Sequence, residues 1–183
     1  MPVTNKHKPA YPLKPPLEKN LKLLFDWDAD GRREFAAKLT PAEMMLVLLN
    51  VGEVVGRIKL QKEMFLAYRE VFTSELVMDP GFQPAKFGPF SRLVADIPAY
   101  LRVYGRIRVE PRGESHSTYV IAPEGRNQAR TIEERPQIHE LLPKLAYAKR
   151  QWNQLDTQGI IRYIYRRYPE LATKTAVPSL RWQ

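Results

Sequence analysis

Apolar side chains recur every three or four residues along most of the chain, which is the period of amphipathic helices. The clearest helix start is Thr40-Pro41-Ala42-Glu43, where an N-cap hydroxyl precedes a proline at the first helical position and a glutamate at the third. A helix is therefore predicted to begin at Pro41 and to end before Gly52. The same period predicts further helices over residues 17–27, 57–73, 91–105, 137–155 and 157–168.

Two local features qualify this helical pattern. Ser91 can cap the helix over 91–105, but Pro98 lies inside it and removes one backbone hydrogen bond, so we expect that helix to be bent or divided. Residues 74–90 are rich in proline and glycine around a few apolar side chains. That composition predicts an ordered but irregular loop.

After the helix predicted over residues 91–105, apolar side chains recur at every second residue instead of every third or fourth. Residues 106–110 and 117–121 alternate, and a turn containing Gly113 separates them. This pattern is typical of a β-hairpin. We expect its inward face to consist of Ile107, Val109, Tyr119 and Ile121.

The order of elements, three helices followed by a hairpin with a basic tip, predicts a mainly α protein with a β-hairpin wing (α+β). More specifically, it predicts a winged helix-turn-helix with additional N- and C-terminal helices. We divide the chain into a mobile, basic, proline-rich arm (1–16), a winged-helix domain with an N-terminal helical extension (17–125) and a C-terminal helical extension (126–183).

Composition adds a basic charge and removes several kinds of chemistry. Among 183 residues, Lys and Arg number 29 and Asp and Glu number 20, a net charge of +9 that favours an anionic partner. The chain has no cysteine, which excludes disulfides, thiolate catalysis and Cys-ligated zinc. No apolar run is long enough for a membrane span and no secretory leader pattern is present, so we expect a cytoplasmic protein without a membrane partner. The arginine-rich, cysteine-free composition also favours a thermophilic source.

Basic side chains gather on the elements that a winged helix presents to DNA. Phosphates favour cations at such a surface because neutralising them releases condensed counterions. The predicted contacts to double-stranded DNA are Arg92, Arg102, Arg106, Arg108, Arg112, His116, Lys59 and Lys62. Two alternatives stay open: alternating arginines also suit the solvated face of a hairpin, and Lys59 and Lys62, one turn apart, also suit a solvated helix face.

Catalytic constellations are sparse. His7, His116 and His139 form no pair at metal-ligand spacing, and no lysine-terminated phosphate loop follows the glycines at 52 and 56. We therefore predict a non-enzymatic protein with no metal and no cofactor.

Three short motifs carry a resemblance. Lys59-Leu-Gln-Lys62, Phe87-Gly-Pro-Phe-Ser91 and Tyr163-Ile-Tyr-Arg-Arg-Tyr-Pro-Glu170 resemble, in their order and spacing, segments of small archaeal and bacterial winged-helix proteins that include relatives of the Panacea antitoxin domain. The likeness covers roughly residues 40–175. It departs from the family after the final proline, where this chain has Thr173-Lys-Thr175.

The function predicted from these observations is DNA binding through the third core helix and the basic wing, with use in transcriptional regulation. The alternative is a protein-interaction adaptor or an antitoxin-like module whose basic surface binds an acidic protein. Self-association as a homodimer through the C-terminal helices is also open.

Overall fold

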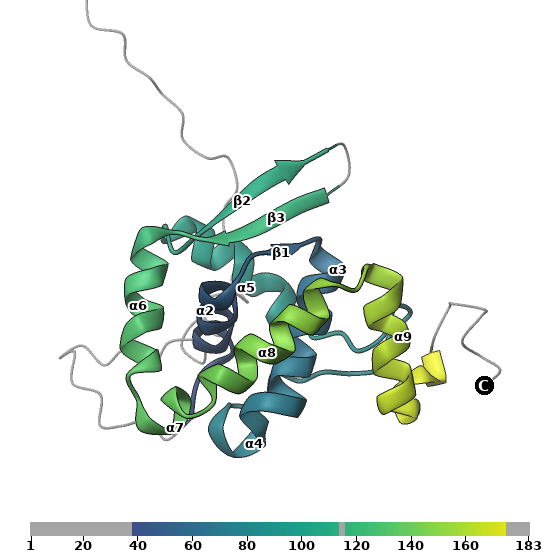
Figure 1. The fold of residues 1–183 in the computed structure, drawn as a ribbon. Coiled ribbons are helices and arrows are strands. Elements are labelled where there is room, and N and C mark those ends of the chain that lie inside the picture. Colours follow the sequence, from purple (N-terminus) through teal and green to yellow (C-terminus); the bar gives the residue numbers. More distant parts are fainter. Residues whose placement is uncertain (1–37, 114–115, 175–183) are drawn as a thin grey trace, which may run out of the picture.

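The computed structural model describes residues 38–113 and 116–174 (Figure 1). The arm predicted for 1–16 and the helix predicted for 17–27 lie outside these residues. Within them the protein is a mainly helical α+β structure with one small three-stranded antiparallel sheet.

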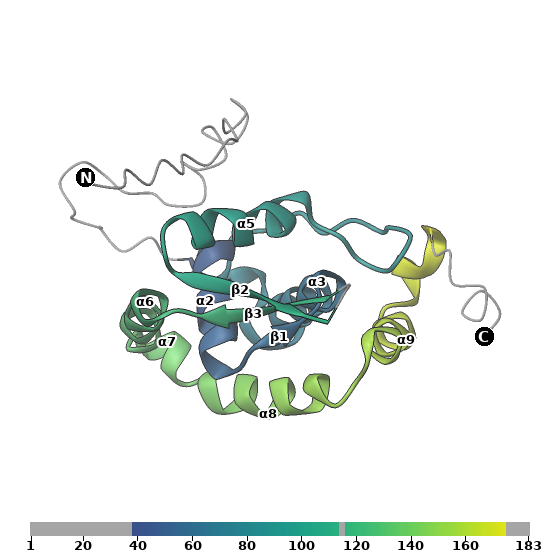
Figure 2. The same cartoon turned by 90° about the horizontal axis from the view of Figure 1, so that it is seen from above.

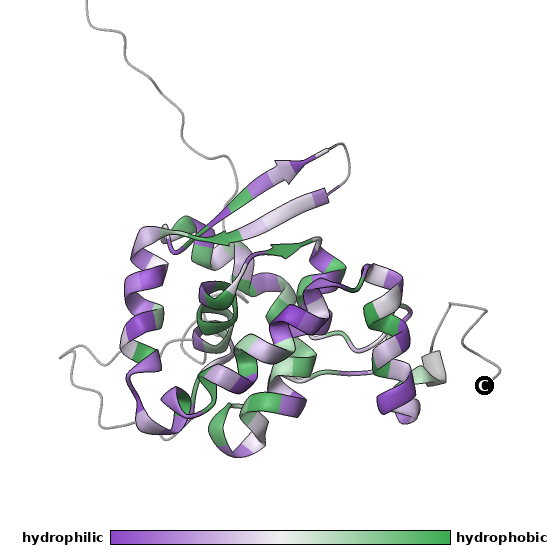
Figure 3. Ribbon diagram, viewed as in Figure 1, coloured by the Kyte–Doolittle hydropathy of each residue, from purple (hydrophilic) through white to green (hydrophobic). Residues whose placement is uncertain are grey.

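The first described helix, α2 (Pro41–Val51), forms the centre of the core. Thr40 caps it as predicted: its hydroxyl accepts a hydrogen bond from the Glu43 N–H, and the Glu43 carboxylate accepts one from the Thr40 N–H. Residues 41–49 are all buried, so α2 is covered on every side. Figure 3 shows this helix coloured largely as hydrophobic.

The second core helix is continuous but irregular. It comprises α3 (Arg57–Leu66), a π-helical segment η1 (Ala67–Phe72) and the short α4 (Thr73–Leu76). Thr73 adopts a positive φ of 62° where η1 meets α4. The prediction of one helix over 57–73 therefore holds in extent, but its last third is π-helical.

An irregular segment then leads to α5 (Arg92–Val103), as predicted. The Ser91 hydroxyl accepts a hydrogen bond from the Val94 N–H, which caps α5. Pro98 is buried within α5, and the helix is not divided there.

The sheet contains the predicted hairpin and one strand that the pattern did not reveal. Strands β2 (Ile107–Arg112) and β3 (His116–Ile121) pair antiparallel, and Ile107 lies opposite Ile121. Ile107, Tyr119 and Ile121 are buried, which confirms the predicted inward face, and Val109 packs against it. The added strand, β1 (Val54–Val55), pairs with the other edge of β3, so the order is β1-β3-β2.

The remaining helices pack around α2 and α3. They are α6 (Pro123–Glu133), α7 (Pro136–His139), α8 (Leu142–Asn153), α9 (Thr157–Arg167) and the 3₁₀ segment η2 (Pro169–Lys174). The single helix predicted over 137–155 is two helices, because Pro143 occupies the first turn of α8 and cannot continue a helix from α7. Figure 2 shows α6, α8 and α9 around the core while α5 runs along the opposite edge.

The apolar core is one contiguous cluster that extends from Leu39 to Ile164. It joins α2, α3, α5 and the sheet to the C-terminal helices, so α8 and α9 contribute to the same interior as the hairpin. No described helix combines the length and the apolar character that a membrane crossing requires.

Candidate functional site

The hairpin projects from the body of the protein (Figure 1). It carries the exposed Arg108 and Arg112. Arg108 forms an ion pair with Glu110 at 3.3 Å, and Arg112 lies 3.9 Å from Glu53, which precedes β1. All four side chains are more than half exposed. Exposed ion pairs contribute little free energy, so both arginines remain able to pair with an incoming anion.

Helix α5 presents a mixed surface beside the hairpin. Arg92 is exposed and pairs with Asp96 at 3.1 Å, so the N-terminal turn of the helix has little net charge. Arg102 is exposed near the other end, next to the exposed Val103 and Tyr104. The surface of α5 is thus less basic than its arginines alone suggest.

The remaining hairpin residues occupy different settings. Arg106 is half-buried, and its carbonyl accepts a hydrogen bond from the Ala122 N–H where β3 leads into α6. His116 is exposed at the start of β3, and its ring lies close to Gly56. The predicted contacts Arg102, Arg108, Arg112 and His116 are therefore all at the surface.

The structure places Lys59 and Lys62 in the interior, neither on a DNA-facing surface nor on a solvated helix face. The Lys59 ammonium donates to the carbonyls of Leu155 at 2.8 Å and Asn153 at 3.3 Å, which end α8. The Lys62 ammonium donates to the Pro89 carbonyl at 2.8 Å. Both side chains are therefore buried, unlike the exposed arginines for which we also predicted DNA contacts.

Two of the three motifs that carry the resemblance, Lys59–Lys62 and Phe87–Ser91, contact each other directly. The side-chain amide of Gln61 donates to the Ser91 carbonyl and accepts from the Ser91 N–H, both at 3.0 Å. The Ser91 hydroxyl, besides capping α5, donates to the Pro80 carbonyl. Lys-Leu-Gln-Lys and Gly-Pro-Phe-Ser therefore form one unit that fixes the start of α5 against α3.

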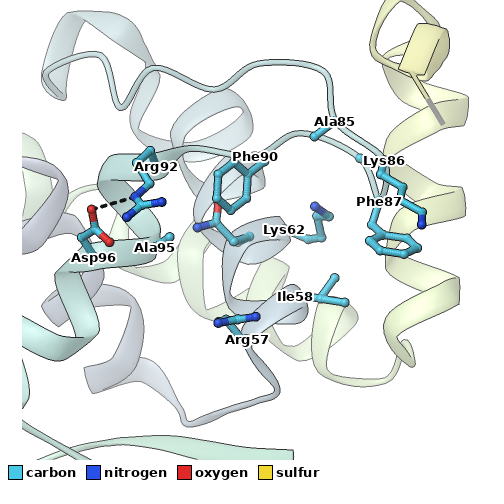
Figure 4. A pocket seen from close by; sticks show the side chains of 12 residues that line it. Arg57, Ile58, Lys62, Ala85, Lys86, Phe87, Phe90, Arg92, Ala95 and Asp96 are labelled. Carbon is cyan, nitrogen blue, oxygen red and sulfur yellow. Dashed lines mark hydrogen bonds and ion pairs between the residues drawn. The ribbon is translucent and has the colours of Figure 1, made fainter. Parts of the chain in front are cut away.

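A pocket of about 530 Å³ opens beside this unit (Figure 4). The first two turns of α3, the loop at 85–90 and the first turns of α5 form its walls. Most of its charged lining is cationic (Arg57, Lys62, Lys86 and Arg92), with one carboxylate, Asp96, and its large apolar side chains are Ile58, Phe87 and Phe90. Sequence reasoning missed this pocket because none of its residues forms a recognisable ligand-binding motif.

A second buried cation lies on the other side of α3. Lys149 of α8 forms an ion pair with Glu63, and its ammonium also donates to the Glu53 carbonyl and to Asn153 Oδ1. Burial raises the pKa of Glu63 and lowers that of Lys149, while their mutual attraction opposes both shifts. This network ties α3, α8 and the segment before β1 together.

Within residues 38–113 and 116–174, no three His, Cys, Asp or Glu side chains gather in a way that could hold an ion. A scan against protein-family models and searches of curated proteins and of solved structures each found no match.

Proposed function

We propose that this chain is a non-enzymatic winged-helix protein that binds double-stranded DNA through α5 and the β2-β3 hairpin and acts in transcriptional regulation. The observation that carries the proposal is the topology: helix, short strand, helix, helix and hairpin, with the sheet order β1-β3-β2. In a winged helix the third helix and the hairpin lie side by side on the DNA-facing surface. The resemblance to small archaeal and bacterial winged-helix proteins supports the same reading.

The position of α5 supports the proposal further. The C-terminal helices α6, α8 and α9 lie on the sides of the core away from α5 (Figure 2). The described helices thus leave the outer face of α5 and the hairpin uncovered. Arg102, Arg108 and Arg112 supply its phosphate-binding cations, together with the half-buried Arg106.

The test is the salt dependence of binding to a duplex of arbitrary sequence. Replacing Arg106, Arg108 and Arg112 with alanine should weaken binding at low salt. The slope of the logarithm of the binding constant against the logarithm of the salt concentration should fall by an amount that corresponds to up to about 3 phosphate contacts. The matched control replaces Arg150, Arg162 and Arg166, which are exposed on α8 and α9, and removes the same charge. An equal loss in both variants would show that net charge alone, and not the wing, attracts DNA.

A second function is favoured by the mixed surface of α5. Val103 and Tyr104 are 67% and 56% exposed at its end, and the Arg92–Asp96 pair lowers its charge. Large exposed apolar groups are more typical of a protein interface than of a phosphate contact. The rival proposal is thus an adaptor or antitoxin-like module that binds an acidic protein.

The same salt series separates the two functions. DNA binding predicts that the logarithm of the binding constant falls steeply and linearly with the logarithm of the salt concentration. If the wild-type protein binds no duplex even at low salt, the DNA proposal fails and the adaptor reading takes its place. Replacing Val103 and Tyr104 with serine then should disrupt the complex with the protein partner.

A further inference from the structure

Among the described residues, the buried Lys62 has no counter-ion. Only 2% of the residue is exposed, and within residues 38–113 and 116–174 its ammonium makes one hydrogen bond, donated to the Pro89 carbonyl at 2.8 Å. No carboxylate lies within 4.0 Å of it in the part of the chain that the structure describes. A lysine ammonium has three N–H donors, and a buried charge without a partner is costly. Lys62 therefore retains unused capacity for an anion.

Lys62 also borders a space in which an anion can be placed. Figure 4 shows its side chain between Phe90 and Phe87 in the pocket of about 530 Å³. That volume is within the range of pockets that hold small organic molecules. Burial lowers the pKa of Lys62 to about 8, so the group is mostly protonated at neutral pH.

The rest of the lining determines what kind of anion fits. Ile58, Phe87 and Phe90 are each about two-fifths exposed, at 38%, 44% and 41%, and provide an apolar surface around the charge. Arg57 is exposed at the same pocket and has no ion pair with a described carboxylate. A ligand with one anionic group and an apolar body matches both features.

Inorganic phosphate matches the pocket less well. Phosphate sites usually collect several N–H groups at a helix N-terminus. Here Ser91 already occupies the Val94 N–H at the start of α5. Asp96, which lies 3.1 Å from Arg92, also lines the pocket, and its carboxylate disfavours a multiply charged anion there.

We propose that this pocket binds a small organic carboxylate, with its anionic group at Lys62 and its apolar body against Ile58, Phe87 and Phe90. The proposal goes beyond DNA binding and does not depend on it. Two of the pocket walls are the loop at 85–90 and the start of α5, so ligand binding contacts the segment that positions α5.

The experiment titrates the full chain with benzoate, benzamide or inorganic phosphate near pH 7 and follows the backbone amide resonances of Gly88 and Arg92. No DNA is present, so failure of this proposal is distinguishable from failure of the proposed function. Benzoate should give saturable shifts, and its neutral analogue benzamide should bind at least about tenfold more weakly because it lacks the charge that pairs with Lys62. Equal affinity for benzoate and benzamide, tighter binding of phosphate, or no saturable shift with benzoate would each overturn the proposal.

A pair of variants assigns the charge to Lys62. Lys62→Met keeps an unbranched side chain without the charge and should weaken benzoate binding at least about tenfold. Lys86→Met, at the exposed rim, is the matched control and should weaken it less than about threefold. Unchanged benzoate affinity in Lys62→Met would overturn the proposal.

A measurement on the wild-type protein covers the case in which Lys62→Met does not fold. A bound carboxylate raises the pKa of a neighbouring ammonium, so binding near pH about 8.5 should take up protons. Calorimetry of benzoate binding in two buffers of different ionisation enthalpy measures that uptake. Proton-neutral binding at this pH would show that Lys62 is not the partner and would overturn the proposal.

Discussion

Lys149 and Lys62 are buried to nearly the same degree, 1% and 2% exposed, but their ammonium groups have very different surroundings. Lys149 has a carboxylate, an amide oxygen and a backbone carbonyl around it. Lys62 has a single carbonyl on one side and a pocket on another. Both sites involve α3: Lys62 belongs to it, and Lys149 of α8 pairs with Glu63, the next residue of α3.

The difference separates a structural cation from a candidate ligand-binding one. Removing one partner of a buried, fully hydrogen-bonded ion pair destabilises the fold, because the other charge is left buried and unpaired. A buried charge with unused donors carries a cost that a ligand can offset. Perturbed groups of the second kind are the ones that gather at functional sites.

The largest effect should come from removing the Lys149 ammonium, which donates hydrogen bonds to three acceptors. Lys149→Met leaves the Glu63 carboxylate buried without its direct partner and should lower the free energy of unfolding by about 3–5 kcal/mol. Urea denaturation followed by far-UV circular dichroism measures this loss. The double variant Lys149→Met/Glu63→Gln removes the orphaned charge as well and should recover a large part of it. A loss of less than about 1 kcal/mol in the single variant would contradict the structural role assigned to the pair.

The next effect concerns the pH dependence of the unsatisfied site. The folded protein holds the pKa of Lys62 near 8, whereas an unfolded lysine titrates near 10.4, so the unfolded chain binds more protons between these values. Burial of the charged Lys62 therefore lowers the free energy of unfolding by its full amount below about pH 8. This destabilisation disappears as the pH rises from about 8 to above about 10.4. The difference between the folded and unfolded pKa values corresponds to a destabilisation of about 3 kcal/mol.

Lys62→Met isolates that contribution because the other titrating groups are common to both proteins. The variant should be more stable than the wild type at pH 7, and the difference should shrink by about 2.5 kcal/mol as the pH rises from 7 to 10. Urea denaturation of both proteins at several pH values measures it. A difference that does not change with pH would show that Lys62 has an ordinary pKa in the folded state.

The elements of this fold were largely predictable because their signals are local. Thr40 and Glu43 specify the start of α2, and Ser91 specifies the start of α5, through hydrogen bonds within four residues. The alternation of Ile107, Val109, Tyr119 and Ile121 likewise specifies which face of the hairpin is buried. Pro143, which starts α8, was a local signal too, although we predicted one helix through it.

The surroundings of the lysines were not predictable, because their partners are distant in sequence. Lys59 and Lys62 look like a basic pair one helical turn apart, but the carbonyls of Leu155 and Pro89 that receive them have no side-chain signature. Strand β1 was hidden for a similar reason: two residues cannot show alternation, and only pairing with β3 defines it. Burial of a charge is thus a tertiary property that the hydrophobic pattern alone does not reveal.

The smallest effect compares two glycines, one beside each lysine. Gly88 has a φ of +85°, and a Cβ at this position would lie 3.1 Å from the Lys62 Cε. Gly52 has an extended backbone, with a φ of 174°, and a Cβ there would lie 3.7 Å from the Lys149 Cε. Gly88→Ala should therefore lower the free energy of unfolding by about 1–2 kcal/mol. Alanine is strained in this left-handed backbone conformation, and its Cβ would be too close to the Lys62 side chain. Gly52→Ala, its control, should change it by less than about 0.5 kcal/mol.

Combining Gly88→Ala with Lys62→Met divides the cost of the glycine replacement into its two causes. Methionine is flexible at the position where the Cβ would press, so the steric share should be relieved, while the backbone strain at residue 88 should remain. Urea denaturation of the two single variants and the double variant gives the coupling free energy, expected to be about 0.5 kcal/mol or more. Strict additivity would show that the loop at 85–90 does not press on Lys62, and that the wall of the pocket is looser than the wall around Lys149.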